Sequence, residues 1–242
     1  MCPSHRAAGL LNSTYLFYSS DNGYHLGHLQ LPDGKSHFYE FDARVPFLVR
    51  GPRVAAGSTP ATVAGNVDLA PTFLALAGLD AREVAPLMDG RSVLPWLLQL
   101  DAELSAGGSR AHGGAPVQGT GYRVQDPHGL SEATDSSWRS AFLLEFSGLR
   151  NWPKAGHRIN DSPNNTWRAL RIVEPTVNWL YAEWTNVADY DYDHVRWYEL
   201  YDLASDPYQL DNQYYTKTDE PTKRALAKRL LRQWKCAGEK CD

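Results

Sequence analysis

The segment "TYLFYSSDNGYHLGHLQLPDGK", residues 14–35, decides how the first half of this chain is expected to fold. It opens with a continuous apolar and aromatic run, residues 14–20, which predicts a parallel strand buried on both faces. The run stops at Asp21, and polar side chains follow at once. In an α/β sheet, ligands collect outside the carboxyl ends of the strands, so this polar segment falls where a site would lie.

The residues after this segment extend the α/β pattern. Residues 45–52, closed by Gly-Pro, predict a second short strand. Residues 66–80 predict a helix that Asp68 can cap and Gly78 can end. Strand, long loop, strand and helix together predict an α/β layer.

The second half of the chain has a different pattern. Residues 104–137 are rich in Gly, Ser and Ala without a period, which predicts a linker or insertion between residues 1–103 and residues 138–242. Four short aromatic or β-branched runs then predict a small antiparallel sheet, at residues 140–146, 166–174, 178–184 and 196–203. Residues 220–235 predict an amphipathic helix packed on that sheet.

The composition excludes several classes of protein. With 242 residues, 43% of them hydrophobic, the chain can bury a sizeable core. Its net charge of -4 comes without basic blocks, so it lacks the electrostatic pattern of a nucleic-acid binder. No run approaches the roughly 18 apolar residues that a membrane span requires, and the first 20 residues show no signal-peptide pattern.

Cysteines and asparagine triplets favour a secretory compartment. Cys236 and Cys241 can close a small terminal disulfide loop or remain two free thiols, and their surroundings do not suit a four-ligand zinc site. Asn12, Asn160 and Asn164 each begin an Asn-x-Ser/Thr triplet, the acceptor pattern for N-glycosylation.

The polar segment contains the candidate chemical groups. Asp21 and Asn22 offer the hard oxygen ligands that calcium prefers, although Asp-Asn-Gly is equally explained as turn chemistry. Lys35 follows a Leu-Pro-Asp-Gly turn that can direct its ammonium back toward the strand end, where it could neutralise an anionic oxygen, or it is a solvated lysine. His25 and His28 can donate protons or serve the loop structurally.

Residues 20–52, "SDNGYHLGHLQLPDGKSHFYEFDARVPFLVRGP", resemble the calcium-dependent sulfatases of the alkaline-phosphatase-like superfamily. The likeness is greatest to the branch that contains N-acetylglucosamine-6-sulfatase and the heparan-sulfate endosulfatases. It continues in the family's order through "GNVDLAPTFLALAGL", "MDGRSVLPWL", "NNTWRALRI", "ELYDLASDPYQLDNQ" and the closing "CAGEKC".

The resemblance implies a fold and specific roles. The fold would be the C-terminal part of an alkaline-phosphatase-like sulfatase sheet, formed by residues 1–103, plus a small antiparallel sheet packed with a C-terminal helix, formed by residues 138–242. Asp21 and Asn22 would ligate calcium, and Lys35 would contact the sulfate and its bridging oxygen. His25 would face the substrate and assist catalysis.

The family's nucleophile has no clear match in the chain. Sulfatases of this kind use a formylglycine made from Cys or Ser in Cys/Ser-x-Pro-x-Arg, well before the Asp-Asn-Gly segment. In "CPSHR", residues 2–6, Cys2 and Arg6 have the right separation but Pro3 comes one place early, so Cys2 is not taken as the nucleophile. We therefore expect the C-terminal portion of a sulfatase that is inactive and poorly stable alone and depends on the N-terminal part of its own catalytic domain.

Three functions remain open at this point. The first is a sulfuric ester hydrolase that removes sulfate from a 6-O-sulfated glucosamine of a glycosaminoglycan, or from an aryl sulfate, in a lysosomal or extracellular setting. The second is a non-catalytic remnant that binds calcium or a sulfated glycan. The third is a related phosphoester hydrolase, since such enzymes also pair a metal with a tetrahedral anion.

Overall fold

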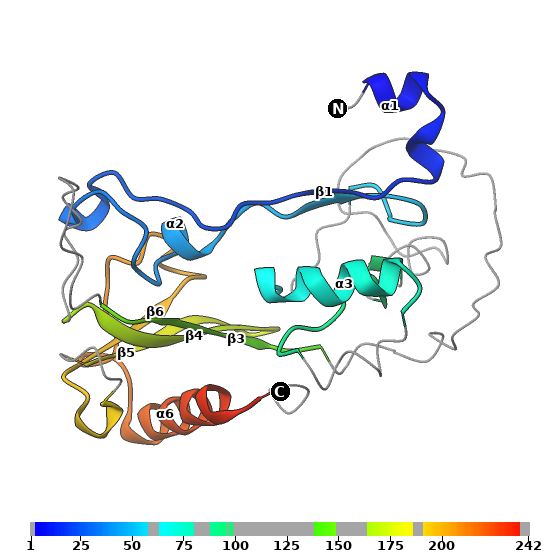
Figure 1. The fold of residues 1–242 in the computed structure, drawn as a ribbon. Helices are drawn as coiled ribbons and strands as arrows, with labels where there is room; N and C mark the ends of the chain where they lie inside the picture. The colour runs from blue at the N-terminus through cyan, green and yellow to red at the C-terminus, as the bar shows by residue number, and fades with distance from the viewer. Residues whose placement is uncertain are drawn as a thin grey trace, which may run out of the picture. The chain divides into compact units, whose positions relative to one another are not determined.

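The fold is taken from a computed structural model, which describes residues 3–57, 63–79, 88–95, 97–98, 138–148, 164–185 and 191–237 (Figure 1). The chain divides into two compact units. The first comprises Met1–Tyr18, Leu48–Pro60 and Gly65–Trp138, and the second comprises Ser19–Phe47, Ala61–Ala64 and Arg139–Asp242. The predicted linker, residues 104–137, lies outside the described residues, so the predicted domain limits stay a prediction.

The first unit contains both strands predicted in the N-terminal half. After α1 (Pro3–Ala7) and η1 (Leu10–Asn12), β1 (Leu16–Tyr18) pairs with β2 (Leu48–Arg50). The pairing is antiparallel, with Phe17 opposite Val49, and the side chain of Tyr18 is 63% exposed. The prediction of a parallel strand buried on both faces is therefore wrong for the described chain, because β2 is the only described strand beside β1.

The predicted helix of residues 66–80 is confirmed as η3 (Asn66–Asp68) followed by α3 (Leu69–Leu76). Gly78 has a φ of 88°, the left-handed conformation that ends many helices. Asp68 does not cap the backbone of α3. Its buried carboxylate instead accepts hydrogen bonds from the amides of Gly65 and Arg91, both at 2.8 Å. Asp68 therefore joins two loops of the first unit.

The second unit is built on the predicted antiparallel sheet. Its four strands follow one another in space as they do in sequence: β3 (Ala141–Phe146), β4 (Thr166–Glu174), β5 (Val177–Thr185) and β6 (Trp197–Asp202). Each strand of this meander pairs in the antiparallel direction with the strand that follows it in the sequence. The prediction from the aromatic and β-branched runs is confirmed strand by strand.

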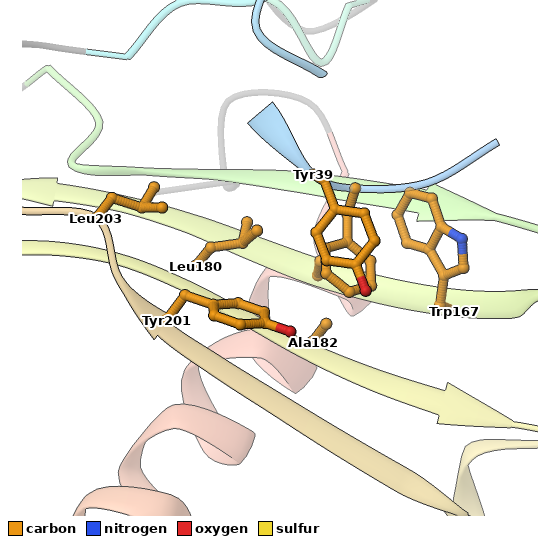
Figure 2. Packing of buried hydrophobic residues seen from close by; sticks show 8 residues of the cluster. Tyr39, Trp167, Leu180, Ala182, Tyr201 and Leu203 are labelled. Atoms are coloured by element: carbon orange, nitrogen blue, oxygen red, sulfur yellow. The ribbon is translucent and has the colours of Figure 1, made fainter. Parts of the chain in front are cut away.

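Both faces of this sheet are covered. Because side chains alternate along a strand, Trp167 and Ala169 face one side of β4, and Leu170 and Ile172 face the other. The loop before β2, which carries η2 (His28–Gln30) and α2 (Glu40–Ala43), covers the first face, and α6 (Glu220–Lys235) covers the second (Figure 1). Figure 2 shows Tyr39 of the loop meeting side chains of β4, β5 and β6 in the first of these cores.

The helix α6 is amphipathic, as predicted. Asp219 caps its N-terminus by accepting a hydrogen bond from the Thr222 amide at 2.9 Å, and Leu226 and Leu230 are buried against the sheet. A stacked arginine adds to the contacts of α6: the guanidinium of Arg168 lies 4.8 Å from the Trp234 ring centre and 4.1 Å from that of Tyr192, which begins η6 (Tyr192–His194). None of the described helices has the length and apolar character needed to cross a membrane.

Candidate functional site

The polar loop that follows β1 in sequence is held against α2 by backbone hydrogen bonds. The amide of Gly23 donates to the carbonyl of Asp42 at 2.8 Å, and the amide of Tyr24 donates to the carbonyl of Phe41 at 3.0 Å. A Cβ atom at position 23 would overlap the Phe41 carbonyl oxygen. Gly23 is therefore required by a close approach of two backbones, and it is not among the glycines with positive φ that a left-handed turn would use.

A second backbone contact closes the loop on itself. His25 and Gly34 form an antiparallel bridge, with N–H···O distances of 2.8 and 3.1 Å. The residues between them include Gly27 at φ 86° and Leu29 at φ 52°, which turn the chain back. This bridge returns Lys35 to the start of the loop, as the Leu-Pro-Asp-Gly turn predicts.

The structure brings Asp21, Asn22 and Lys35 together. The Lys35 ammonium donates to Asn22 Oδ1 at 2.8 Å and lies 3.8 Å from Asp21 Oδ2. The side chains of Lys35 and Asp21 are 56% and 81% exposed, so the three groups are accessible to a ligand. The carboxylate of Asp21, the amide oxygen of Asn22 and the ammonium of Lys35 thus lie together at the surface, although Asn22 and Lys35 are thirteen residues apart in sequence.

These oxygens suit a calcium ion in their chemistry but not in their number. Carboxylate and amide oxygens are typical calcium ligands, and calcium takes about six to eight of them. The Asn22 oxygen accepts a hydrogen bond from the Lys35 ammonium, so in this arrangement its partner is the cationic side chain of the same loop. Within the described parts of the chain no three His, Cys, Asp or Glu side chains gather as a metal site. Asp21 and Asn22 can therefore supply part of a coordination shell.

His25 lies in a different environment from Lys35. Its side chain is 2% exposed, and Nδ1 lies 2.8 Å from both carboxylate oxygens of Asp42. A carboxylate accepts hydrogen bonds, so Nδ1 carries the proton and Nε2 is the nitrogen left for a further proton or ligand. Asp42 also accepts from the His37 amide at 3.0 Å. The pair can orient a proton-transfer group, or it can simply lock the loop.

Residues of the C-terminal half of the chain bind this loop through hydrogen bonds and an ion pair. The indole of Trp167 donates to the Ser36 carbonyl at 3.0 Å, next to Lys35. Arg171 binds the Glu40 carboxylate at 2.8 Å, and Gln209 accepts from the Glu40 amide at 2.8 Å. The position of Lys35 therefore depends on residues more than 125 positions later in the chain.

Sequence reasoning missed two of the residues that support the site. Asp42 belongs to the quoted Tyr-Glu-Phe-Asp stretch, but nothing in that stretch indicates that it binds His25. Gln209 has a φ of 57° and is buried, a conformation that no local pattern predicts. Both act through long-range contacts, which composition and periodicity do not reveal.

A buried carboxylate lies under the loop. Glu199 of β6 accepts hydrogen bonds from the hydroxyls of Tyr39, at 3.1 Å, and Tyr201, at 2.7 Å, and from the indole of Trp197, at 3.1 Å. Burial raises the pKa of Glu199 above its ordinary value, and the hydrogen bonds from the two tyrosines oppose that shift. Burial also raises the pKa of Tyr39, so this phenol stays protonated and keeps donating.

An open cavity of about 570 Å³ lies beside the same loop. Its wall combines His28 and Phe41, whose rings stack at 5.0 Å, with the exposed aromatic ring of Tyr208. Gln209 also lines it, and the Gln209 Nε2 atom has no hydrogen-bond partner among the described residues. The cavity thus offers mainly apolar and aromatic surface to a ligand.

The remaining predicted sites are only partly described. Asn12 and Asn164 are exposed, as glycosylation would require, whereas Asn160 lies outside the described residues. Cys236 directly follows α6, and Cys241 also lies outside the described residues. Glycosylation and the Cys236–Cys241 disulfide therefore stay predictions.

Comparison with known proteins identifies sequence relatives. The sulfatase family model matches residues 5–79. Human N-acetylglucosamine-6-sulfatase is 34% identical over 96% of this chain and 37% of its own length. An extracellular sulfatase homologue of Drosophila melanogaster is 52% identical over 59% of this chain and 10% of its own length, and an arylsulfatase of Volvox carteri is 33% identical over 97% and 31%. The chain spans about a third of the length of the relatives that it matches along almost its whole extent.

Solved structures agree on the fold. A protein in complex with its substrate D-glucosamine-2-N,6-O-disulfate matches with a TM-score of 0.62 at 23% identity, over 95% of this chain and 36% of its own. The phosphonate monoester hydrolase of Agrobacterium radiobacter matches with a TM-score of 0.61 at 20% identity, over 95% and 36%. At these identities the likeness establishes the fold alone, and it confirms the predicted alkaline-phosphatase-like class.

Proposed function

Because this chain belongs to the sulfatase family, we propose that it forms the calcium-binding and sulfate-binding C-terminal part of a sulfuric ester hydrolase. The observation that carries the proposal is the position of Lys35, whose ammonium lies 2.8 Å from Asn22 Oδ1 and 3.8 Å from Asp21 Oδ2. In this arrangement the two oxygens can bind a metal ion, and the neighbouring ammonium can bind an oxygen of the sulfate group.

Each residue of the cluster has a distinct task in this proposal. Asp21 and Asn22 hold calcium, which when bound would act as a Lewis acid on the sulfate ester. Lys35 binds the sulfate and stabilises the negative charge that develops on the bridging oxygen. In the described structure its exposed ammonium lies beside these ligands, hydrogen-bonded to Asn22 Oδ1, and calcium on that oxygen would free the ammonium to bind the sulfate.

We assign His25 a supporting catalytic role. Asp42 fixes the proton on Nδ1, which leaves Nε2 to accept a proton and, once protonated, to donate a hydrogen bond to the substrate. Gly34 lies against this nitrogen: a Cβ atom there would come within 3.3 Å of Nε2. A side chain at position 34 would therefore crowd Nε2, which lies within the buried part of the loop.

In this proposal, the described residues do not supply the nucleophile or the remaining calcium ligands. The formylglycine nucleophile and the further calcium ligands would come from the N-terminal part of the catalytic domain, with which Asp21, Asn22 and Lys35 would complete one site. The match of the sulfatase family model to residues 5–79, which include the three residues of the cluster, supports this arrangement.

The substrate proposed is a 6-O-sulfated glucosamine, with an aryl sulfate as the simpler alternative. N-acetylglucosamine-6-sulfatase and arylsulfatase are the names of relatives at 34% and 33% identity. We also propose a secretory, lysosomal or extracellular location. The exposure of Asn12 and Asn164 and the extracellular sulfatase among the relatives support it.

Replacement of Lys35 tests the proposal. In the protein encoded by the complete gene, we expect Lys35→Met to lower kcat/KM for a 6-sulfated N-acetylglucosamine aryl glycoside and for an aryl sulfate by about 10²–10³-fold, the effect of removing one charge-stabilising group. Lys217→Met is the matched control, because its side chain is 59% exposed against 56% for Lys35 and it pairs with Asp211. The control should retain full activity.

Parallel assays distinguish the alternatives. Faster hydrolysis of an aryl phosphate than of the aryl sulfate would favour the phosphoester hydrolase. Saturable binding of the sulfated sugar without release of sulfate would favour the non-catalytic protein. Equal activity of Lys35→Met and the unaltered protein would refute the role of Lys35.

A further inference from the structure

A second cavity lies on the face of the sheet that α6 covers. Its volume is about 440 Å³, within the roughly 300–1,000 Å³ of small-ligand sites, and it opens between the start of β3 and the middle of α6. Four of its lining side chains are basic: Arg139, Lys228, Arg229 and Arg232. No acidic side chain lines it among the described residues.

The helix that forms one wall of this cavity has an unusual charge balance. The sequence of α6, "EPTKRALAKRLLRQWK", contains six basic residues and one acidic residue, Glu220. The whole chain has a net charge of -4, so the positive charge is concentrated in this element. Such a local excess produces a positive potential that attracts anions.

Two of the four basic groups are fixed in position. Arg229 donates to Glu174 Oε1 and to Ser140 Oγ, both at 2.7 Å, which ties α6 to the ends of β3 and β4. Arg139 is 9% exposed, and its guanidinium lies 5.5 Å from the centre of the Phe142 ring. Both guanidinium groups are therefore fixed in position, and the Glu174 carboxylate already balances the charge of Arg229, so Arg229 acts mainly to shape the wall of the cavity.

The other two basic groups have no ion-pair partner among the described residues. Lys228 and Arg232 are exposed, and neither forms an ion pair with any residue that the structure describes. They are four residues apart on one helix face, where like charges destabilise a helix. The C-terminal helix dipole stabilises Arg232 in the last turn, but Lys228 lies in the middle of α6 and gains nothing from it. A bound anion would relieve this repulsion.

We propose that this cavity is a second, non-catalytic binding site for a sulfate group of a sulfated glycan. Guanidinium and ammonium groups bind tetrahedral oxyanions through charge-assisted hydrogen bonds, and arginine does so with two donors at once. The open cavity leaves space for the sugar ring that carries the sulfate. The choice of a sulfated glycan as the source of the anion rests on the proposed function.

The site is separate from the Lys35 cluster. Ser36, next to Lys35, binds Trp167 on the face of the sheet that the loop covers, whereas Leu226 and Leu230 of α6 pack on the opposite face. Figure 1 shows α6, in red, across the sheet from α2, in light blue. A glycan bound at the cavity would therefore anchor the protein to a sulfated polymer without entering the reaction.

A charge-matched pair of double variants tests the site. We expect the protein from the complete gene to bind an immobilised, size-defined heparin-type oligosaccharide in low salt, and Lys228→Ser/Arg232→Ser to bind it about tenfold more weakly, as two exposed charge contacts are lost. Arg224→Ser/Lys235→Ser removes the same charge from exposed positions of α6 outside the cavity, so it should bind within about twofold of the unaltered protein. Inorganic sulfate and inorganic phosphate, added as competitors, identify the anion that is preferred.

The outcomes separate this inference from the proposed function. Equal loss of binding in the two double variants would overturn the inference, because it would mean that only the net charge of α6 matters. Stronger competition by phosphate than by sulfate would also overturn the choice of a sulfated glycan. Hydrolysis of a small aryl sulfate, measured on the same samples, should be unchanged in both variants. If no sulfate is released by any sample but the two double variants still differ in oligosaccharide binding, the proposed function is refuted and the inference of a second binding site stands.

Discussion

Glu199 is a buried carboxylate that accepts hydrogen bonds from two phenols and an indole of the described chain, all of them neutral. A carboxylate without a positive partner is less stable in its charged form when buried, because neutral dipoles replace water only in part. The charge state of this group therefore affects the stability of the core beneath the loop that carries Lys35.

The raised pKa of Glu199 gives a pH dependence with a definite sign. The native state favours the protonated form, so its contribution to stability is complete below the ordinary glutamate pKa and is lost as the pH rises through the higher native value. We expect Glu199→Gln, which cannot ionise, to become progressively more stable relative to the unaltered protein between acidic and neutral pH. Thermal unfolding at a series of pH values measures this, and parallel stability curves would contradict it.

At the residue scale, the sequence predicts the chemical groups better than their surroundings. The adjacency of Asp21 and Asn22 and the turn before Lys35 are local features, and the structure brings the three together. The partner of His25 is not local: Asp42 is 17 residues away, and burial follows from packing in three dimensions. Gly23 looks like a turn residue in the sequence, but the structural reason for it is the nearby Phe41 carbonyl.

At the element scale, α6 is attached mainly through its apolar face. Leu226 and Leu230 are buried against Leu170, Ile172 and Tyr181 of the sheet. The polar contacts of α6 with the sheet, such as that of Arg229 with Glu174, lie at the margin and are partly exposed. Because partly exposed ion pairs contribute little, the packing of the leucines should dominate the attachment.

Neighbouring leucines of α6 provide a matched test of this packing. Leu230 is fully buried, so Leu230→Ala should lower the free energy of unfolding by about 2–5 kcal/mol through lost burial and the cavity that remains. Leu231 is among the exposed apolar residues, so Leu231→Ala should change it by less than about 0.5 kcal/mol. Urea unfolding followed by tryptophan fluorescence measures both, and similar values for the two variants would contradict this account of the helix.

The positions of strands and helices could be predicted from short-range patterns in the sequence. The direction in which β1 and β2 pair in the first unit could not be predicted in this way. The four strands of the second unit follow one another as a meander, so sequence order alone gives their spatial order. The strands β1 and β2 are separated by a long loop, and nothing local fixes their relative direction. Apolar composition suggests a buried parallel strand for β1, whereas the described pairing is antiparallel with an exposed Tyr18.

At the scale of the whole molecule, removal of calcium should affect stability and activity together. A ligand that binds only the folded state adds about 2.7 kcal/mol to the free energy of unfolding when its concentration is 100 times its Kd. In the protein from the complete gene, a calcium chelator should therefore lower Tm by several degrees and abolish sulfate release. Asp21→Ala should show both losses without the chelator. Asp33→Ala, in the same loop, is the control and should respond to the chelator as the unaltered protein does. A Tm that the chelator leaves unchanged would argue against calcium at Asp21 and Asn22.

The contact between Trp167 and the Ser36 carbonyl has a consequence for synthesis on the ribosome. The two residues are 131 positions apart, and chains elongate at about 5–20 residues per second, so Ser36 leaves the ribosome roughly 7–26 s before its partner. During that time the loop has no sheet to pack on, and Phe38 and Tyr39, buried in the finished fold, face solvent. The loop that carries Lys35 is thus made early and ordered late, and we expect this interval to be the period in which the nascent chain depends most on chaperones.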